Sequence, residues 1–147
     1  MLNMRNRLFV FNFSLVGFML IVPSVSHAEW VEVGHSDERA LQMYYEPASI
    51  MKNGDIATVK VLKNFKAPKN SVDPKRPYTF QSTISTQEIQ CSSSKERPLH
   101  IDIWSRLSGA GKIEQSHDYR EKYDWGKSFK ATSIENVVIT KACQFKT

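Results

Sequence analysis

The 147-residue sequence predicts an α+β fold: an antiparallel sheet of about six strands, with a C-terminal helix packed on one face and disulfide-linked to the sheet. β-Prone segments separated by turn signals recur at intervals of roughly 8–12 residues or slightly more, which is typical of an antiparallel sheet. The apolar period then becomes helical near the C-terminus, and strands followed by one helix indicate an α+β protein. With 41% hydrophobic and 24% charged residues, the composition resembles neither a disordered nor a collagen-like chain.

The N-terminus has the pattern of a secretory signal peptide. Arg5 and Arg7 precede an apolar run over Leu8–Val22, and small residues end at Ala28. A membrane anchor is the alternative, but this run is shorter than the about 20 residues that a spanning helix needs. We therefore expect residues 1–28 to be removed, leaving a single α+β domain over 29–147 in the periplasm or at the cell exterior. No cysteine lies near the cleavage site, so no lipid anchor is expected.

The first three strands are predicted from turn signals and alternation. Trp30–His35 and Leu41–Tyr45 form a hairpin, and Pro47 is expected to stop the second strand. Asn53-Gly54 suits a tight turn before the third strand, Ile56–Phe65, which has one apolar face and one face expected to be solvated.

The next segments complete the sheet. Tyr78–Cys91 is β-prone, and its apolar parity switches between Ile84 and Ile89, which predicts a bulge. The clearest alternation, Leu99, Ile101, Ile103 and Leu107, indicates a half-buried strand, and a last strand is expected near Lys112–Tyr119.

A helix is predicted from about Ser133 to Gln144. Thr132 is the expected N-cap, with Glu135 three residues later completing a capping box. The apolar stripe consists of Ile134, Val138, Ala142 and Phe145. Before it lie Tyr119, Tyr123, Trp125 and Phe129, which we expect to cover an edge of the core.

The two cysteines are expected to form a structural disulfide, because export places the chain in an oxidising compartment. Cys91 and Cys143 are 52 positions apart. Closing a loop of that length contributes about 4 kcal/mol in the chain-entropy model. A redox role is the alternative, but the cysteines lack C-x-x-C spacing.

No catalytic, metal or cofactor site is predicted. His35, His100 and His117 are too far apart in sequence for a typical metal motif. Residues 108–112 only faintly match a phosphate-binding loop, and no serine lies in a G-x-S-x-G elbow. We therefore expect a non-enzymatic protein without a cofactor.

A basic segment is the candidate partner-binding site. Without the signal peptide the chain carries 18 Lys and Arg against 15 Asp and Glu, a balance too mild to indicate nucleic-acid binding. Positive charge is nevertheless concentrated along a strand end and a Pro-interrupted loop, and loops on rigid scaffolds often bind partners. The alternative is that these lysines keep a loop and a sheet edge soluble. The candidates are Lys60, Lys63, Lys66, Lys69, Lys75 and Arg76.

Several sequence landmarks together resemble the bacterial surface-adhesin protein E family. They are Trp30–Gly34, Tyr44–Ile50 (Tyr-Tyr-Glu-Pro-Ala-Ser-Ile), Asn53–Asp55, Gly109–Lys112, Ala142-Cys143 and the paired cysteines. The resemblance covers nearly all of the mature chain and implies an antiparallel sheet, a C-terminal helix and a disulfide. It also implies an envelope protein of a Gram-negative bacterium, similar to adhesins that bind host matrix or serum proteins.

The leading hypothesis is thus an exported binding module for a protein or an acidic extracellular polymer. The alternative is a periplasmic structural or accessory protein that meets bacterial partners only. We expect no membrane span in the mature chain, and a homodimer through open sheet edges is a further possibility.

Overall fold

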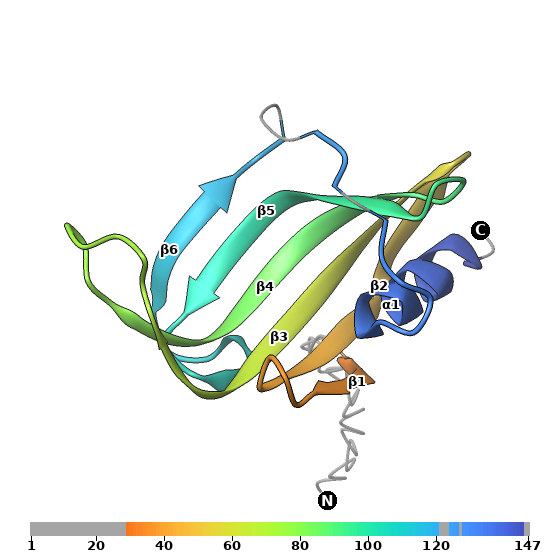
Figure 1. Ribbon diagram of the computed structural model, residues 1–147. Coiled ribbons are helices and arrows are strands. Elements are labelled where there is room, and N and C mark those ends of the chain that lie inside the picture. The colour runs from red at the N-terminus through yellow and green to blue at the C-terminus, as the bar shows by residue number, and fades with distance from the viewer. Residues whose placement is uncertain (1–28, 121–123, 127, 146–147) are drawn as a thin grey trace, which may run out of the picture.

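The computed structural model describes residues 29–120, 124–126 and 128–145. Six antiparallel strands lie side by side in chain order and form one strongly curved sheet, with a single helix across its inner face (Figure 1). The predicted α+β architecture is confirmed. The elements are β1 (Val31–Ser36), β2 (Leu41–Asn53), β3 (Ile56–Asn70), β4 (Thr79–Gln90), β5 (Lys95–Trp104), the 3₁₀ turn η1 (Leu107–Gly109), β6 (Ile113–Asp118) and α1 (Ile134–Cys143).

β2 does not stop at Pro47, as the sequence predicted, because the ladder accommodates this proline in a bulge. Pairing with β3 shifts between Glu46 and Met51, so no ladder hydrogen bond is required from the proline nitrogen. Within the bulge, the Ser49 hydroxyl accepts a hydrogen bond from the Lys60 N–H at 2.8 Å. The strand therefore continues to Asn53.

β3 is also longer than predicted, again because a bulge in the ladder accommodates a proline. Its pairing with β4 shifts between Asn64 and Lys69, and Pro68 lies within that irregularity. The strand bends there, and the Lys66 N–H donates to the Ala40 carbonyl at 2.9 Å. Both long strands thus pass a proline at a bulge and extend the sheet beyond the predicted ends.

The predicted bulge in β4 is wrong, because β4 pairs with β3 without interruption from Ser82 to Gln90. The extra residue is Leu99 on β5, since Thr86 pairs with His100 and Gln87 pairs with Pro98. Ile84 and Ile89 are an odd number of positions apart, so regular alternation places them on opposite sides of β4. Both are apolar because η1 and α1 each pack against β4.

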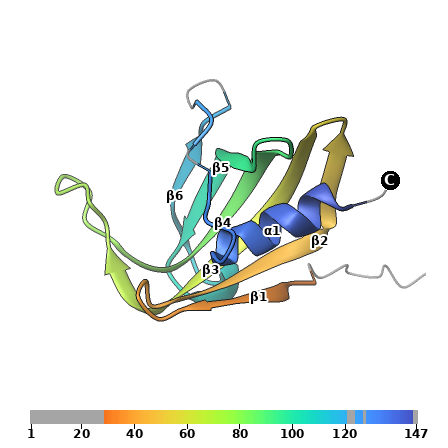
Figure 2. The same ribbon diagram turned by 45° about the vertical axis from the view of Figure 1, so that its right-hand side comes forward.

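α1 covers the inner face of β1 to β3 and one end of β4 (Figure 2). The core beneath it is closed to solvent: Ala57, Val59 and Ile89 of the sheet and Ala142 of the helix are 0% exposed. Alternation on β3 puts its small and β-branched side chains on this face. The whole buried cluster comprises Leu41, Met43, Ile50, Ala57, Val59, Val61, Ile89, Val138, Ile139 and Ala142.

The opposite face of β3 is not wholly solvated, because η1 folds under it. Leu62 is 1% exposed there, and Asn64 accepts a hydrogen bond from the Ser108 N–H at 2.8 Å. The buried Ser82 hydroxyl donates to the Arg106 carbonyl at 2.6 Å. Leu107, predicted to lie on the half-buried strand, is part of η1 and is 45% exposed.

The N-cap of α1 lies one residue later than expected. Ser133, not Thr132, is the N-cap, and its hydroxyl accepts from the Asn136 N–H at 3.2 Å. Glu135 turns to the sheet and pairs with Arg39 instead of completing a capping box. Phe145 lies beyond the helix end and is 39% exposed, so it does not belong to the buried stripe.

The expected disulfide is present and fastens the end of α1 to the end of β4. The Cα atoms of Cys91 and Cys143 are 5.6 Å apart. The Lys52 ammonium adds a second tie, because it donates to the Cys143 carbonyl at 2.7 Å. Within the described ranges, no helix is long and apolar enough to cross a membrane. The predicted signal peptide over 1–28 lies outside the described residues.

Candidate functional site

The six basic residues of the candidate site do not form one patch. Lys60 lies on the outer face of β3, 3.5 Å from a Glu46 carboxylate oxygen. Lys63 is on the inner face, where its charge acts on Glu96 and Glu135. Lys66 donates to Asp37 at 2.7 Å, beside the β1–β2 turn. Alternation and the β3 bulge therefore separate these three lysines: Lys60 and Lys66 form ion pairs, and Lys63 lies on the inner face near Glu96 and Glu135.

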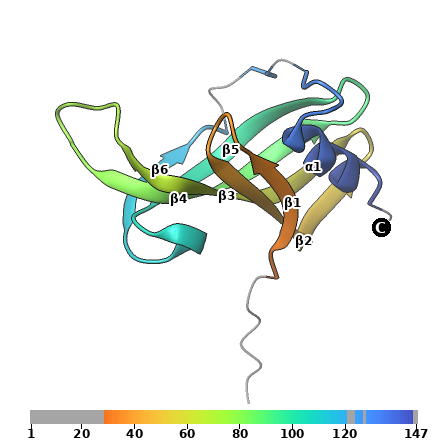
Figure 3. The ribbon, with the colours of Figure 1, turned by 60° about the horizontal axis from the view of Figure 1, so that its bottom comes forward.

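Lys69, Lys75 and Arg76 lie at the far end of the β3–β4 hairpin, which projects from the sheet away from α1 (Figure 3). None of the three forms an ion pair within the part of the chain that the structure describes. The Lys69 ammonium lies 5.8 Å from the centroid of the Phe65 ring. Unlike Lys60 and Lys66, these three residues have no carboxylate partner among the described residues, and unlike Lys63 they lie on the projecting hairpin; we call them the hairpin cations.

Local hydrogen bonds and two prolines order the turn of the hairpin. The Ser71 N–H donates to the Tyr78 carbonyl at 2.9 Å, and Asp73 accepts from the Lys75 N–H at 2.9 Å. Pro74 and Pro77 flank the turn and restrict its backbone. Lys75 and Arg76 are therefore presented on an ordered turn, and Lys69 lies on β3 just before it.

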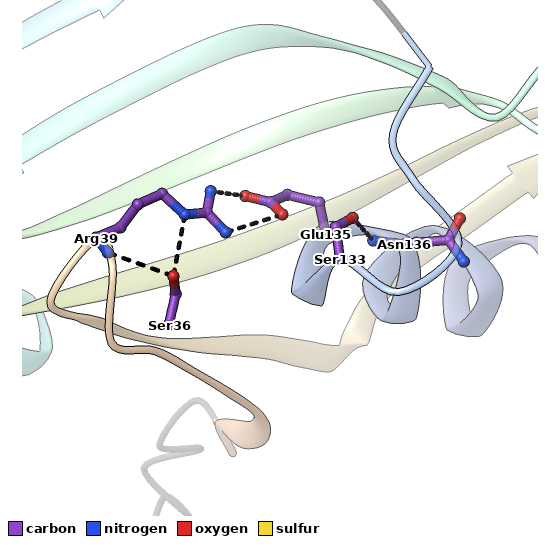
Figure 4. Close-up of polar contacts among 5 residues, drawn as sticks. All are labelled: Ser36, Arg39, Ser133, Glu135 and Asn136. Carbon is purple, nitrogen blue, oxygen red and sulfur yellow. Dashed lines mark hydrogen bonds and ion pairs between the residues drawn. The ribbon is translucent and has the colours of Figure 1, made fainter.

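A groove of about 620 Å³ lies at the other end of the molecule, between the β1–β2 turn and the N-terminus of α1. The Arg39 guanidinium crosses it and forms two hydrogen bonds with the buried Glu135 carboxylate, while its Nε atom donates to Ser36 (Figure 4). Burial by itself raises the pKa of Glu135, but the hydrogen bonds from Arg39 and from its own backbone leave the pKa below the ordinary value of 4.5. The pair therefore ties α1 to the sheet.

The pKa of Glu96 is shifted in the opposite direction from that of Glu135. It faces the same side of the sheet as Ile89, its pairing partner on β4, and burial raises its pKa above 4.5. Lys63 opposes this shift, whereas Glu135 adds to it. The Oε2 atom of Glu96 is buried and has no hydrogen-bond partner among the described residues.

A serine, a histidine and an aspartate meet on the outer face of β5 and β6. Ser116 and Asp102 each contact the Nε2 atom of His100, at 3.2 and 3.1 Å. A hydrolase triad requires the carboxylate on the other imidazole nitrogen, from which it orients the ring toward the serine. The arrangement therefore lacks the geometry of that catalytic unit.

The remaining histidines are separate. His35 is exposed near Asp37, and His117 stacks on Tyr119 with ring centroids 5.6 Å apart. Within residues 29–120, 124–126 and 128–145, no group of three or more His, Cys, Asp or Glu residues is placed to hold a metal ion.

The aromatic residues before α1 have different roles. Phe129 packs against the core, as expected, whereas the Trp125 ring lies 4.5 Å from the Arg97 guanidinium carbon, and Arg97 also pairs with Glu88. Tyr123 lies outside the described residues.

The sequence profile of surface-adhesin protein E matches residues 30–144, most of the chain. This chain belongs to the surface-adhesin protein E family. The matched range begins at the Trp30 landmark and ends one residue after the disulfide cysteine of α1. Membership of this surface-adhesin family implies an exported protein.

Solved structures of protein E from Haemophilus influenzae share the fold. The selenomethionine form has a TM-score of 0.52 at 13% identity, over 82% of this chain and 90% of that chain. Crystal form II has a TM-score of 0.50 at 15% identity, over 69% and 79%. Protein E from a non-typeable strain has a TM-score of 0.50 at 13% identity, over 78% and 76%. Comparison with curated proteins gives no match.

Sequence inspection missed the residues that the fold gathers beside the hairpin cations. Tyr78 and Phe80 follow the turn, while Gln115 and His117 are on β6 and come near them only through the sheet. The available signals were the alternation of Tyr78 with Phe80 and of Gln115 with His117. Neither signal indicates that these pairs meet.

Proposed function

We propose that this protein is a non-enzymatic, exported binding module of the bacterial envelope, and that the hairpin cations are its contact with a protein or acidic polymer of the host surface. Family membership supports the adhesin class. The observation that carries the assignment of the contact is the charge distribution. Lys69, Lys75 and Arg76 project on a proline-flanked hairpin without carboxylate partners in the described chain, whereas Lys60 and Lys66 pair with acidic residues.

Rigid presentation favours binding over a purely solubilising role. A turn that is already ordered loses less conformational entropy when a partner binds, so its charges contribute more to affinity. Exposed positive charge also accelerates encounter with an acidic partner, and added salt weakens this effect.

Surface plasmon resonance tests the contact against immobilised extracellular-matrix and serum proteins. The test variant carries Lys69→Glu, Lys75→Glu and Arg76→Glu. Its matched control carries Lys95→Glu, Lys130→Glu and Lys141→Glu, which change the net charge equally elsewhere. We expect the hairpin variant to bind at least tenfold more weakly and the control to retain affinity. Equal losses in both variants would remove the hairpin as the contact.

Cell fractionation with surface labelling tests the location. The adhesin assignment requires labelling of intact cells at the hairpin lysines. A protein confined to the periplasm would instead indicate the structural or accessory role with bacterial partners.

A further inference from the structure

A hollow of about 300 Å³ opens where the β3–β4 hairpin meets the inner face of β5 and β6, in the part of the sheet that α1 leaves uncovered. Its walls are mainly carbon: the rings of Tyr78 and Phe80, the side chain of Ile103, and Val72, which is 100% exposed at the rim. A cavity of this kind accepts one apolar side chain of a partner.

The walls of the hollow are held in place before any partner arrives. The Tyr78 hydroxyl donates to the Gln115 side-chain oxygen at 2.7 Å, joining the hairpin to β6. The Phe80 ring meets Phe65 edge-on, with centroids 5.5 Å apart, and Tyr78 at 6.1 Å. Such preorganisation lowers the entropic cost of binding.

A second hollow of about 410 Å³ continues from the first. The two share Asn70, Ser71, Asp73 and Tyr78, and the second extends to Pro74 and Pro77. Together they form a trough around Tyr78, which we call the Tyr78 trough.

The charges near the trough differ along its length. Burial, followed by the negative charges of Asp73 and Glu114, raises the pKa of Tyr78, so the surroundings of this ring disfavour a carboxylate. Lys75 and Arg76 lie in the turn between the two prolines that line the second hollow. Lys69 lies beside Phe65, which in turn contacts Phe80. Asp73 lines both hollows, whereas the hairpin cations lie next to this lining in the chain and form no ion pair among the described residues. The trough therefore has an apolar centre, and cations stand beside it.

We propose that the Tyr78 trough binds an acidic peptide segment of a partner protein, with one uncharged aromatic or large aliphatic side chain in the 300 Å³ hollow and carboxylates on the hairpin cations. This proposal rests on the proposed function and names the class of partner. Among acidic ligands, a protein segment fits better than a polysaccharide because only the segment supplies an apolar anchor for the carbon-lined hollow.

Binding is tested with three synthetic peptides: EDEWEDE, EDEAEDE and KRKWKRK. In ¹⁵N–¹H NMR of the exported, disulfide-bonded protein, EDEWEDE is expected to shift the amide signals of Tyr78, Ile103 and His117. EDEAEDE should bind at least tenfold more weakly, and KRKWKRK should leave these signals unchanged. Equal affinity for the Trp and Ala peptides, or shifts confined to other strands, would overturn the proposal.

Two variants keep the test independent of folding. Ile103→Gln makes the hollow polar, and Lys75→Ala with Arg76→Ala changes only exposed turn residues; both should weaken EDEWEDE at least fivefold. Lys141→Ala on α1 is the matched control and should retain affinity. A heparin oligosaccharide that binds the trough more tightly than EDEWEDE, or concentration-dependent self-association through it, would reassign the trough to a polymer or to a second copy.

The same variants separate this proposal from the proposed function. If matrix and serum proteins lose affinity for the Lys69, Lys75 and Arg76 variant but not for Ile103→Gln, the hairpin binds without the trough and only the further inference fails. If no such protein binds the wild type while EDEWEDE occupies the trough, the adhesin assignment fails and the trough remains a peptide site.

Discussion

The two ends of the curved sheet differ in what lies on their inner face. At one end α1 closes the core and is attached by the disulfide, by Lys52 and by the Arg39–Glu135 pair. At the other end the β3–β4 hairpin borders two hollows, and no helix of the described residues lies over it. The difference indicates that stability is concentrated under α1, which leaves the hairpin end open for recognition.

The largest expected effect comes from the disulfide at the closed end. Replacing both Cys91 and Cys143 with alanine should lower the free energy of unfolding by about 4 kcal/mol, because the unfolded chain regains the entropy of a 52-residue loop. Urea denaturation measures this change. Reducing agent should destabilise the wild type similarly and leave the double variant unaffected; a loss below about 1 kcal/mol would contradict the entropic account.

A cavity created under α1 should lower the free energy of unfolding nearly as much as loss of the disulfide. Ile89→Ala removes a side chain that is 0% exposed and should cost about 3 kcal/mol in urea denaturation. Ile113→Ala on β6 is the matched control, because this side chain is 44% exposed and its truncation should cost less than about 0.5 kcal/mol. Similar losses of unfolding free energy in the two variants would contradict the difference between the closed and the open end.

The Arg39–Glu135 pair should make the stability of the closed end depend on pH. Arg39→Gln leaves Glu135 buried without its cation and should cost about 1–3 kcal/mol at neutral pH, less than a fully buried pair because the arginine side chain is 46% exposed.

Since the folded pKa of Glu135 lies below 4.5, its contribution in the wild type is present above that pH and is lost as the pH falls through the folded pKa. In the variant, burial without Arg39 should reverse this dependence. Urea titrations from about pH 3 to 7 measure it, and an unchanged profile would contradict the role of the pair.

Glu96 should show a smaller effect of opposite sign. Its folded pKa is raised above 4.5, so the wild type loses stability as the pH rises from that value through the folded pKa. Glu96→Gln removes the cost of the buried charge, and its melting temperature should exceed that of the wild type at neutral pH but not at about pH 4. A variant that is less stable at both pH values would show that the carboxylate has a stabilising partner.

The smallest stability effect is expected at the open end. Replacing Lys69, Lys75 and Arg76 with glutamate should change the free energy of unfolding by less than about 0.5 kcal/mol, because these side chains form no ion pairs within the described chain. Urea denaturation under the conditions of the binding assay measures this. A loss above about 1 kcal/mol would show that the hairpin also supports the core.

Local sequence patterns were sufficient to predict the strand series, the C-terminal helix and the cysteine pair. Strand alternation and helical period are local properties, so they can be recognised without knowing what packs on them. The elements near Asn53-Gly54 and the helix stripe at Val138 and Ala142 are of this kind, and both are present in the structure.

How these elements contact one another depends on the packing of distant segments. Pro47 was predicted to end its strand because sequence rules penalise proline in a ladder, and the next strand was predicted to end at Phe65. Both strands continue, because Pro47 and Pro68 each lie in a register shift that only pairing with a neighbouring strand creates. The local sequence predicts a capping box for Glu135, but in the structure its carboxylate accepts hydrogen bonds from Arg39, 96 positions away.

The candidate site likewise depends on contacts between segments that are distant in the sequence. Local charge density selected six basic residues, yet the side chain's face on the strand and the nearest carboxylate divided them into the paired Lys60 and Lys66, the inner-face Lys63 and the hairpin cations. Tyr78 meets Gln115 only because β4, β5 and β6 lie side by side. Periodicity specifies which face a side chain occupies, whereas contacts between distant segments depend on the packing of the whole sheet, and the binding surface is made of such contacts.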